Sequence, residues 1–114
     1  MLPDIRNEDH FLLLYCPCSS LEEAERIATS LVESRLVACA NIIDRIKSVY
    51  WWDGEVQKDD ETLLLAKTIA SNKEQIISTV KELHTYDLPA IVFYKLESGN
   101  KEYLEWITKE CSPV

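Results

Sequence analysis

Glycine, histidine and methionine are scarce in this chain of 114 residues, which contains two glycines, two histidines and one methionine. With four prolines in addition, few residues favour irregular loops, so we expect long helices and strands. Basic residues are also in the minority, because 12 Lys and Arg face 20 Asp and Glu and give a net charge of −8. This deficit argues against nucleic-acid and membrane partners, since both anionic surfaces require clustered positive charge.

Long apolar runs are missing as well, and no stretch approaches the roughly 18 apolar residues of a membrane span. The first ten residues, MLPDIRNEDH, carry acids where a secretory signal needs a basic start and an apolar run. We therefore expect a cytoplasmic protein with reduced cysteines. The four cysteines show no zinc-finger spacing, and each is by default a small buried hydrophobic residue: Cys16, Cys18, Cys39 and Cys111.

Hydrophobic patterning predicts one domain at residues 10–110, between a flexible N-terminal segment at 1–9 and a C-terminal tail at 111–114. Serines 19 and 20 followed by glutamates 22 and 23 indicate a capping box at the start of the first helix. The predicted order is strand, helix, strand, strand, helix, strand and a C-terminal helix, and the first strand is the apolar run FLLLYC at 11–16. This order predicts an α+β fold of the ferredoxin-like βαββαβ type, with an antiparallel sheet and helices on one face.

A long central hairpin is predicted around Asp53-Gly54, the strongest short hairpin signal in the chain. Its two strands would each run about 13 residues, well beyond the usual length. The acidic stretch QKDDE at 57–61 is too polar for a core and indicates a solvated edge or a bulge. The strand ends carry the aromatic residues 50–52 on an arm with bare edges, which favours oligomerisation.

Thiolate and imidazole ligands suit copper or zinc, and Cys16, Cys39 and His84 offer them on separate predicted elements. Cys16 and Cys18 would face the same way on an extended chain, where a disulfide between them would be strained. Two structural alternatives stand beside the metal prediction. His84 ends a helix and can cap its carbonyl groups, and Cys39 lies between alanines as a core residue would.

The sequence contains no nucleophile elbow, phosphate loop or paired carboxylate motif, so it gives no reason to expect an enzyme. Lys67 lies among strand leucines and must reach the rim of the sheet or meet an acid or an anion.

Five collinear segments resemble the CutA family of divalent-cation tolerance proteins: LVESRLVACANII, SVYWWDGEV, ETLLLAKT, ELHTYDLPAI and YLEWI. Together they extend the resemblance from about Phe11 to Ile107. The resemblance implies a ferredoxin-like subunit that forms a homotrimer through its long hairpin strands. It also implies a similarity to the trimers of PII signalling proteins, which bind small ligands in clefts between subunits.

By the same resemblance, copper binding is assigned to residues that match Cys16, Cys39 and His84, with Cys18 as a further thiol. It also implies a ligand cleft at the subunit boundary, formed by Tyr50, Trp52, Glu61, Lys67, His84 and Tyr86. Two positions depart from the family pattern. Ala90 stands where the family usually has glutamate, and Cys18 occupies a position that is often acidic.

We therefore predict a homotrimer that serves metal tolerance by binding Cu(II) or another divalent cation, without catalysis and without an organic cofactor. The alternative is a PII-like sensor or adaptor that binds a small anionic or organic ligand in its cleft. A third possibility is a scaffold in which the polar residues merely fasten the trimer. Lys67 distinguishes the first two, because a cation site does not tolerate an ammonium group whereas an anion site needs one.

Overall fold

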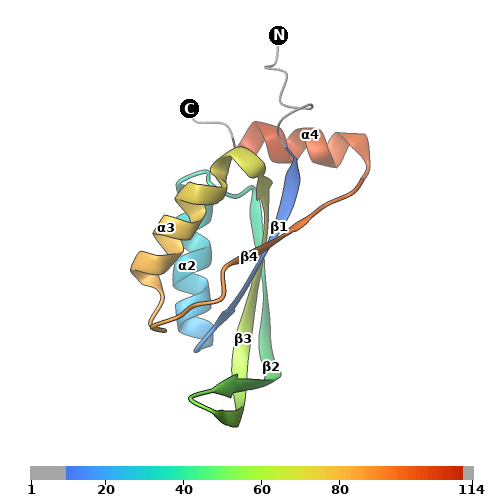
Figure 1. Ribbon diagram of the computed structural model, residues 1–114. Coiled ribbons are helices and arrows are strands. Elements are labelled where there is room, and N and C mark those ends of the chain that lie inside the picture. The colour runs from blue at the N-terminus through green and yellow to red at the C-terminus, as the bar shows by residue number, and fades with distance from the viewer. Residues whose placement is uncertain (1–9, 112–114) are drawn as a thin grey trace.

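The computed structural model describes residues 10–111 (Figure 1). The predicted flexible segment 1–9 and residues 112–114 of the predicted tail lie outside the described residues, so the domain boundaries stay a prediction. The elements along the chain are β1 (Phe11–Cys18), α2 (Leu21–Glu33), β2 (Cys39–Trp52), β3 (Glu55–Ile69), the 3-10 helix η1 (Ala70–Asn72), α3 (Lys73–Leu83), β4 (Val92–Lys95) and α4 (Lys101–Glu110).

The four strands form one antiparallel sheet in the order β2-β3-β1-β4. Helices α2 and α3 lie against one face of this sheet, and α4 lies across the end near the start of β1 (Figure 1). The arrangement confirms the predicted α+β, ferredoxin-like fold with an additional C-terminal helix. None of the helices within residues 10–111 combines the length and hydropathy needed to cross a bilayer.

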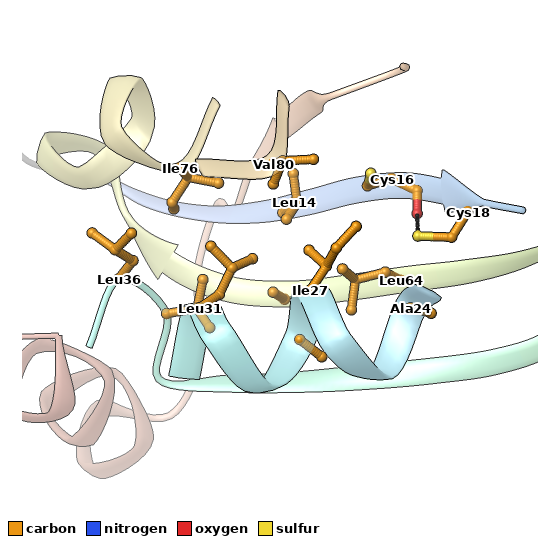
Figure 2. Close-up of a cluster of buried hydrophobic side chains, with 13 residues drawn as sticks. Leu14, Cys16, Cys18, Ala24, Ile27, Leu31, Leu36, Leu64, Ile76 and Val80 are labelled. Atoms are coloured by element: carbon orange, nitrogen blue, oxygen red, sulfur yellow. Dashed lines mark hydrogen bonds between the residues drawn. The ribbon is translucent and has the colours of Figure 1, made fainter. Parts of the chain in front are cut away.

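The core lies between the sheet and helices α2 and α3 (Figure 2). Alternate residues of β1, among them Leu14, Cys16 and Cys18, face the helices and are fully buried. The apolar stripe of α2, including Ile27 and Leu31, packs against them. The apolar residues that recur every second position in the strand thus pack against those that recur at the helical spacing of 3.6, and together they form a single apolar layer.

The first strand extends beyond its predicted end at Cys16 and includes Pro17 and Cys18. Proline lacks the amide hydrogen that a central strand needs, which is why the sequence indicated a break. However, β4 pairs with β1 only from Leu12 to Tyr15, so at Pro17 one side of β1 is an unpaired edge. The strand therefore continues through the proline while it stays paired with β3 on its other side.

The central hairpin is as long as predicted, with 14 residues in β2 and 15 in β3. Its far end extends beyond the helices (Figure 1), and the molecule measures 53 Å along its longest axis. Asp53 and Gly54 form the turn with positive φ angles of 52° and 77°. This is the combination that a type I′ hairpin turn requires.

The hairpin contains a bulge, but on β2 rather than at the acidic stretch 57–61 of β3. The pairing register shifts between Ile43 and Ile46, and Arg45 adopts a φ of 92°. Strand β3 runs without interruption, so its acidic stretch is the solvated edge that the sequence allowed as an alternative. A positive φ is normally supplied by glycine, because other residues are strained there.

We predict that Arg45→Gly leaves stability unchanged or raises it by up to about 1 kcal/mol, because glycine relieves the positive φ. The Arg45–Asp60 pair, at 3.9 Å and exposed, contributes little to offset this gain. Lys58→Gly is the matched control, since it removes the same charge from an exposed position in the regular part of β3. That control should lose about 1 kcal/mol. Chemical unfolding at one protein concentration measures both, and an equal loss in the two variants would contradict the strain at Arg45.

Candidate functional site

Cys16, Cys18 and His84 form a buried cluster in which the candidate ligand atoms lie within 4.8 Å of one another. The alternation of β1 places both thiols on the side that faces the helices. His84 caps the C-terminus of α3 with extended backbone angles, and the imidazole lies against the end of β1. The structure therefore brings together three of the four predicted metal ligands.

Both nitrogens of His84 have hydrogen-bond partners. Nδ1 accepts a hydrogen bond from the backbone N–H of Tyr86 at 3.1 Å, so Nε2 carries the proton. Nε2 donates this proton to the carbonyl oxygen of Pro17 at 2.9 Å. His84 is thus a satisfied structural histidine, and binding of a metal at Nε2 would replace its bond to Pro17.

The thiol of Cys18 donates a weak hydrogen bond to the carbonyl oxygen of Cys16, with Sγ 3.5 Å from the oxygen (Figure 2). The thiol of Cys16 and burial raise the pKa of Cys18, and the nearby charges of Glu23 and Glu61 raise it further. This thiol is therefore protonated at neutral pH. A metal ion must displace its proton, which ions that bind thiolate strongly are able to do.

Glu23 is 2% exposed and joins three segments next to the cluster. Oε1 accepts hydrogen bonds from the backbone and the hydroxyl of Ser19 at 2.8 and 2.9 Å, and Oε2 accepts one from the backbone of Thr85 at 2.8 Å. Oε1 also lies 3.8 Å from Nδ1 of His84. Burial raises the pKa of Glu23, but the hydrogen bonds from Ser19 and Thr85 lower it by more, to about 2.

The capping-box pattern included Glu23 but did not predict that its carboxylate would bind Thr85 as well as Ser19. Ser20 does cap helix α2, because its hydroxyl accepts a hydrogen bond from the backbone of Glu23 at 3.1 Å. The carboxylate, however, reaches Ser19 and also the distant Thr85. The contact with Thr85 depends on tertiary structure and had no signal in the local sequence.

A cavity of about 490 Å³ lies between the hairpin and the segment 86–90. Four of the six predicted cleft residues line it, namely Tyr50, Trp52, Glu61 and Tyr86. His84 does not line the cavity, but its ring packs against Tyr86 with the two centroids 4.6 Å apart. The sequence did not identify the remaining lining residues as part of a cleft: Pro17, Ser48, Trp51, Asp87, Leu88 and Ala90.

Both tyrosines of the cavity donate hydrogen bonds to carboxylates. The hydroxyl of Tyr86 lies 2.8 Å from Oε2 of Glu61, and that of Tyr50 donates to Asp59. Burial and the bond to Glu61 raise the pKa of Tyr86, and the bond to Asp59 raises that of Tyr50. The tyrosines therefore stay neutral, and their hydroxyl protons are committed to these carboxylates.

Lys67 and Cys39 lie apart from both the cluster and the cavity, in a group of their own. Nζ of Lys67 is 3.1 Å from Oδ1 of Asn41 and 3.7 Å from Sγ of Cys39. The hydroxyl of Tyr103 lies 3.4 Å from the same sulfur, and its ring centroid lies 5.8 Å from Nζ. Lys67 lies six positions beyond Glu61 on β3, which corresponds to about 20 Å of extended chain. Within one chain, Cys39 therefore does not join the metal cluster and Lys67 does not join the cavity.

Comparison with known families matches residues 12–110 to the family described as CutA1 divalent ion tolerance protein. The Divalent-cation tolerance protein CutA of Thermus thermophilus is 47% identical over 88 residues, which cover 77% of this chain and 85% of that protein. The protein of the same name from Archaeoglobus fulgidus is 42% identical over 94 residues, covering 82% and 91%. The chain spans 54% of the length of Protein CutA 1, chloroplastic, from Oryza sativa, with 40% identity over 96 residues.

Solved structures agree with the sequence comparison. The crystal structure of CutA1 from Oryza sativa matches with a TM-score of 0.86 and 38% identity, covering 89% of this chain and 93% of that one. The Archaeoglobus fulgidus structure, described as a periplasmic divalent cation tolerance protein, has a TM-score of 0.87 and 38% identity, with coverages of 90% and 99%. The similarity thus extends over sequence and fold.

We predict that Glu23 contributes up to about 3 kcal/mol of stability at neutral pH, from the difference between an ordinary pKa of 4.5 and a folded pKa of about 2. Because the folded pKa is the lower one, this contribution is present above pH 4.5 and is lost as the pH falls towards 2. Glu23→Gln should therefore be markedly less stable than the wild type at pH 7, and the gap should narrow towards pH 2.

The matched control is Glu25→Gln, which changes an exposed glutamate on the same helix. It should differ from the wild type by less than about 0.5 kcal/mol throughout. Chemical unfolding between pH 7 and pH 2.5 measures the differences. A constant gap for Glu23→Gln across this range would show that its carboxylate is not held ionised by Ser19 and Thr85.

Proposed function

The chain belongs to the CutA1 divalent ion tolerance protein family, and we propose that it serves metal-ion tolerance by binding the ion rather than by catalysis. The observation that carries the proposal is the buried cluster of Cys16, Cys18 and His84. Two sulfurs and an imidazole nitrogen already lie within 4.8 Å of one another, so a bound ion has to displace the thiol protons and the bond from Nε2 of His84 to Pro17 but needs no distant side chain.

The donor set favours copper over hard cations. Thiolate ligands select Cu(I) and zinc, imidazole binds copper and zinc, and calcium and magnesium prefer oxygen. We propose copper as the principal ion, with zinc as the competing divalent cation. Cys18, at a position that the resemblance describes as often acidic, supplies the thiol that Cys39 does not supply within one chain. Glu23 fixes the backbone beside the cluster, because its carboxylate accepts hydrogen bonds from Ser19 and Thr85.

We further propose that the protein is a cytoplasmic homotrimer. Apolar residues on the face of the sheet opposite α2 and α3 support assembly, since Ile43, Val92 and Tyr94 are 47%, 46% and 56% exposed. On the hairpin, Val49 and Trp51 are 65% and 73% exposed. Exposed apolar surface together with a projecting hairpin is typical of an interface between subunits.

The PII-like alternative with an anionic ligand has less support. The cationic residue on which it depends, Lys67, lies outside the cavity. Glu61 and Asp87 line the cavity in its place, and an anion would be repelled by both.

We predict that the reduced protein binds one Cu(I) per chain in an anaerobic competition with a chromogenic chelator. Cys18→Ser should weaken binding at least about 100-fold, because it removes a direct ligand and even supporting residues contribute 10- to 100-fold. Cys39→Ser is the matched control and should bind as the wild type does. The same titration with Zn(II) and Cu(II) compares the ions.

If Cys39→Ser loses copper binding while Cys18→Ser retains it, the binding site is the group around Cys39 and Lys67 and the proposed cluster is wrong. The absence of saturable binding above that of a denatured control would remove the metal proposal altogether. His84→Gln adds an independent check, because glutamine retains hydrogen-bonding capacity but not the imidazole ligand.

We predict that native mass spectrometry gives three times the chain mass. Tyr94→Glu, which places a charge on the exposed apolar face of the sheet, should dissociate the assembly into folded monomers. The control Glu33→Lys changes an exposed charge on α2 and should leave the assembly intact. A wild-type protein that remains monomeric at micromolar concentration would refute the trimer.

A further inference from the structure

The cavity between the hairpin and the segment 86–90 is lined by four aromatic rings. Tyr50, Trp51 and Trp52 come from the end of β2, and Tyr86 comes from the segment after α3. Aromatic rings attract cations through the negative charge of their faces, and tryptophan does so most strongly. The volume of about 490 Å³ lies within the range of small-molecule sites.

The charged residues that line the cavity are all acidic. Glu61 and Asp87 line it, and no lysine, arginine or histidine is among the described residues that do so. The hydroxyl protons of Tyr50 and Tyr86 are already donated to Asp59 and Glu61, so these two hydroxyls do not serve an anion. The cavity therefore attracts positive charge and disfavours negative charge.

A bare metal ion does not match this cavity. Within the part of the chain that the structure describes, the one close group of three metal-binding side chains is Cys16, Cys18 and His84, and none of these three lines the cavity. Apolar surface also dominates its wall, through Leu88, Ala90 and the aromatic rings. A matching ligand must therefore combine a positive charge with apolar groups.

We propose that this cavity binds a small alkylammonium cation, with its alkyl groups against Trp52 and Tyr86 and its charge balanced by Glu61 and Asp87. Ala90 favours such a ligand because its short side chain leaves room and adds no charge beside the aromatic wall. The cavity borders the metal cluster through Pro17, which lines the cavity and accepts the hydrogen bond of His84. The two sites nevertheless use different side chains.

Choline tests the proposal when it is compared with 3,3-dimethylbutanol, a neutral molecule of nearly the same shape. Tryptophan fluorescence and calorimetry of the full chain, without added metal, measure binding. Choline should bind saturably, one per chain, and the neutral alcohol should bind at least about 10-fold more weakly, because a desolvated cation–π contact and the carboxylates favour the charge. Equal binding of both molecules would reduce the site to an apolar surface and overturn the proposal.

Variants locate the site. Glu61→Gln keeps an acceptor for the hydroxyl of Tyr86 but removes the negative charge. Asp87→Asn removes the negative charge of an exposed residue. Each variant should weaken choline binding at least about fivefold, because each removes one of the two charges that balance the cation. The matched control is Glu97→Gln, an exposed glutamate outside the cavity, which should bind as the wild type does. Cys18→Ser should also leave choline binding unchanged, which separates this site from the metal site. The absence of saturable binding would refute the cavity as a cation site, and this is also the result expected if a second copy of the chain fills the cavity. Binding that is insensitive to both Glu61→Gln and Asp87→Asn would refute it as well.

Discussion

The hydrogen bond from Nε2 of His84 to the carbonyl oxygen of Pro17 joins the end of α3 to the end of β1, and both candidate sites are built around it. On one side of this bond lie the thiols of Cys16 and Cys18. On the other side, Pro17 and Tyr86 form part of the cavity. This bond positions the imidazole beside the sulfurs, and separate bonds from Tyr86 to Nδ1 of His84 and to Glu61 place the tyrosine beside the hairpin. Glu23 strengthens the junction, because its buried carboxylate binds Ser19 and Thr85 together.

This junction exists because the strands of the sheet differ in length. Strand β4 has four residues and leaves the edge of β1 free beyond Tyr15, whereas β2 and β3 continue for 14 and 15 residues. The free edge accepts a proline and leaves its carbonyl oxygen available to His84. The long hairpin provides the other wall of the cavity. Burial then separates the two kinds of chemistry, with thiols in the apolar core and carboxylates and aromatic rings at the surface.

Much of the fold was predictable from local patterns. The order of elements, the type I′ turn at Asp53-Gly54 and the overlong hairpin follow from hydrophobic periodicity and from one turn signal. The predicted end of β1 at Cys16 was wrong, because a proline in the sequence does not reveal that the pairing of β1 with β4 already stops at Tyr15. The bulge at Arg45 was also missed, since arginine carries no signal for a positive φ. Such errors arise where pairing between distant segments outweighs local preference.

For the candidate sites, the sequence by itself determined the chemical groups: the thiols at 16 and 18, the imidazole at 84, an aromatic arm and an acidic excess. It also indicated that Cys16 and Cys18 face the same way if the chain stays extended through Pro17, because side chains alternate along a strand. Only the tertiary structure decided that His84 joins these two thiols and that Cys39 and Lys67 form a separate group. The physical reason is that periodicity assigns a residue to a face of its own element. Which distant elements meet at that face depends on the lengths and registers of all the strands together.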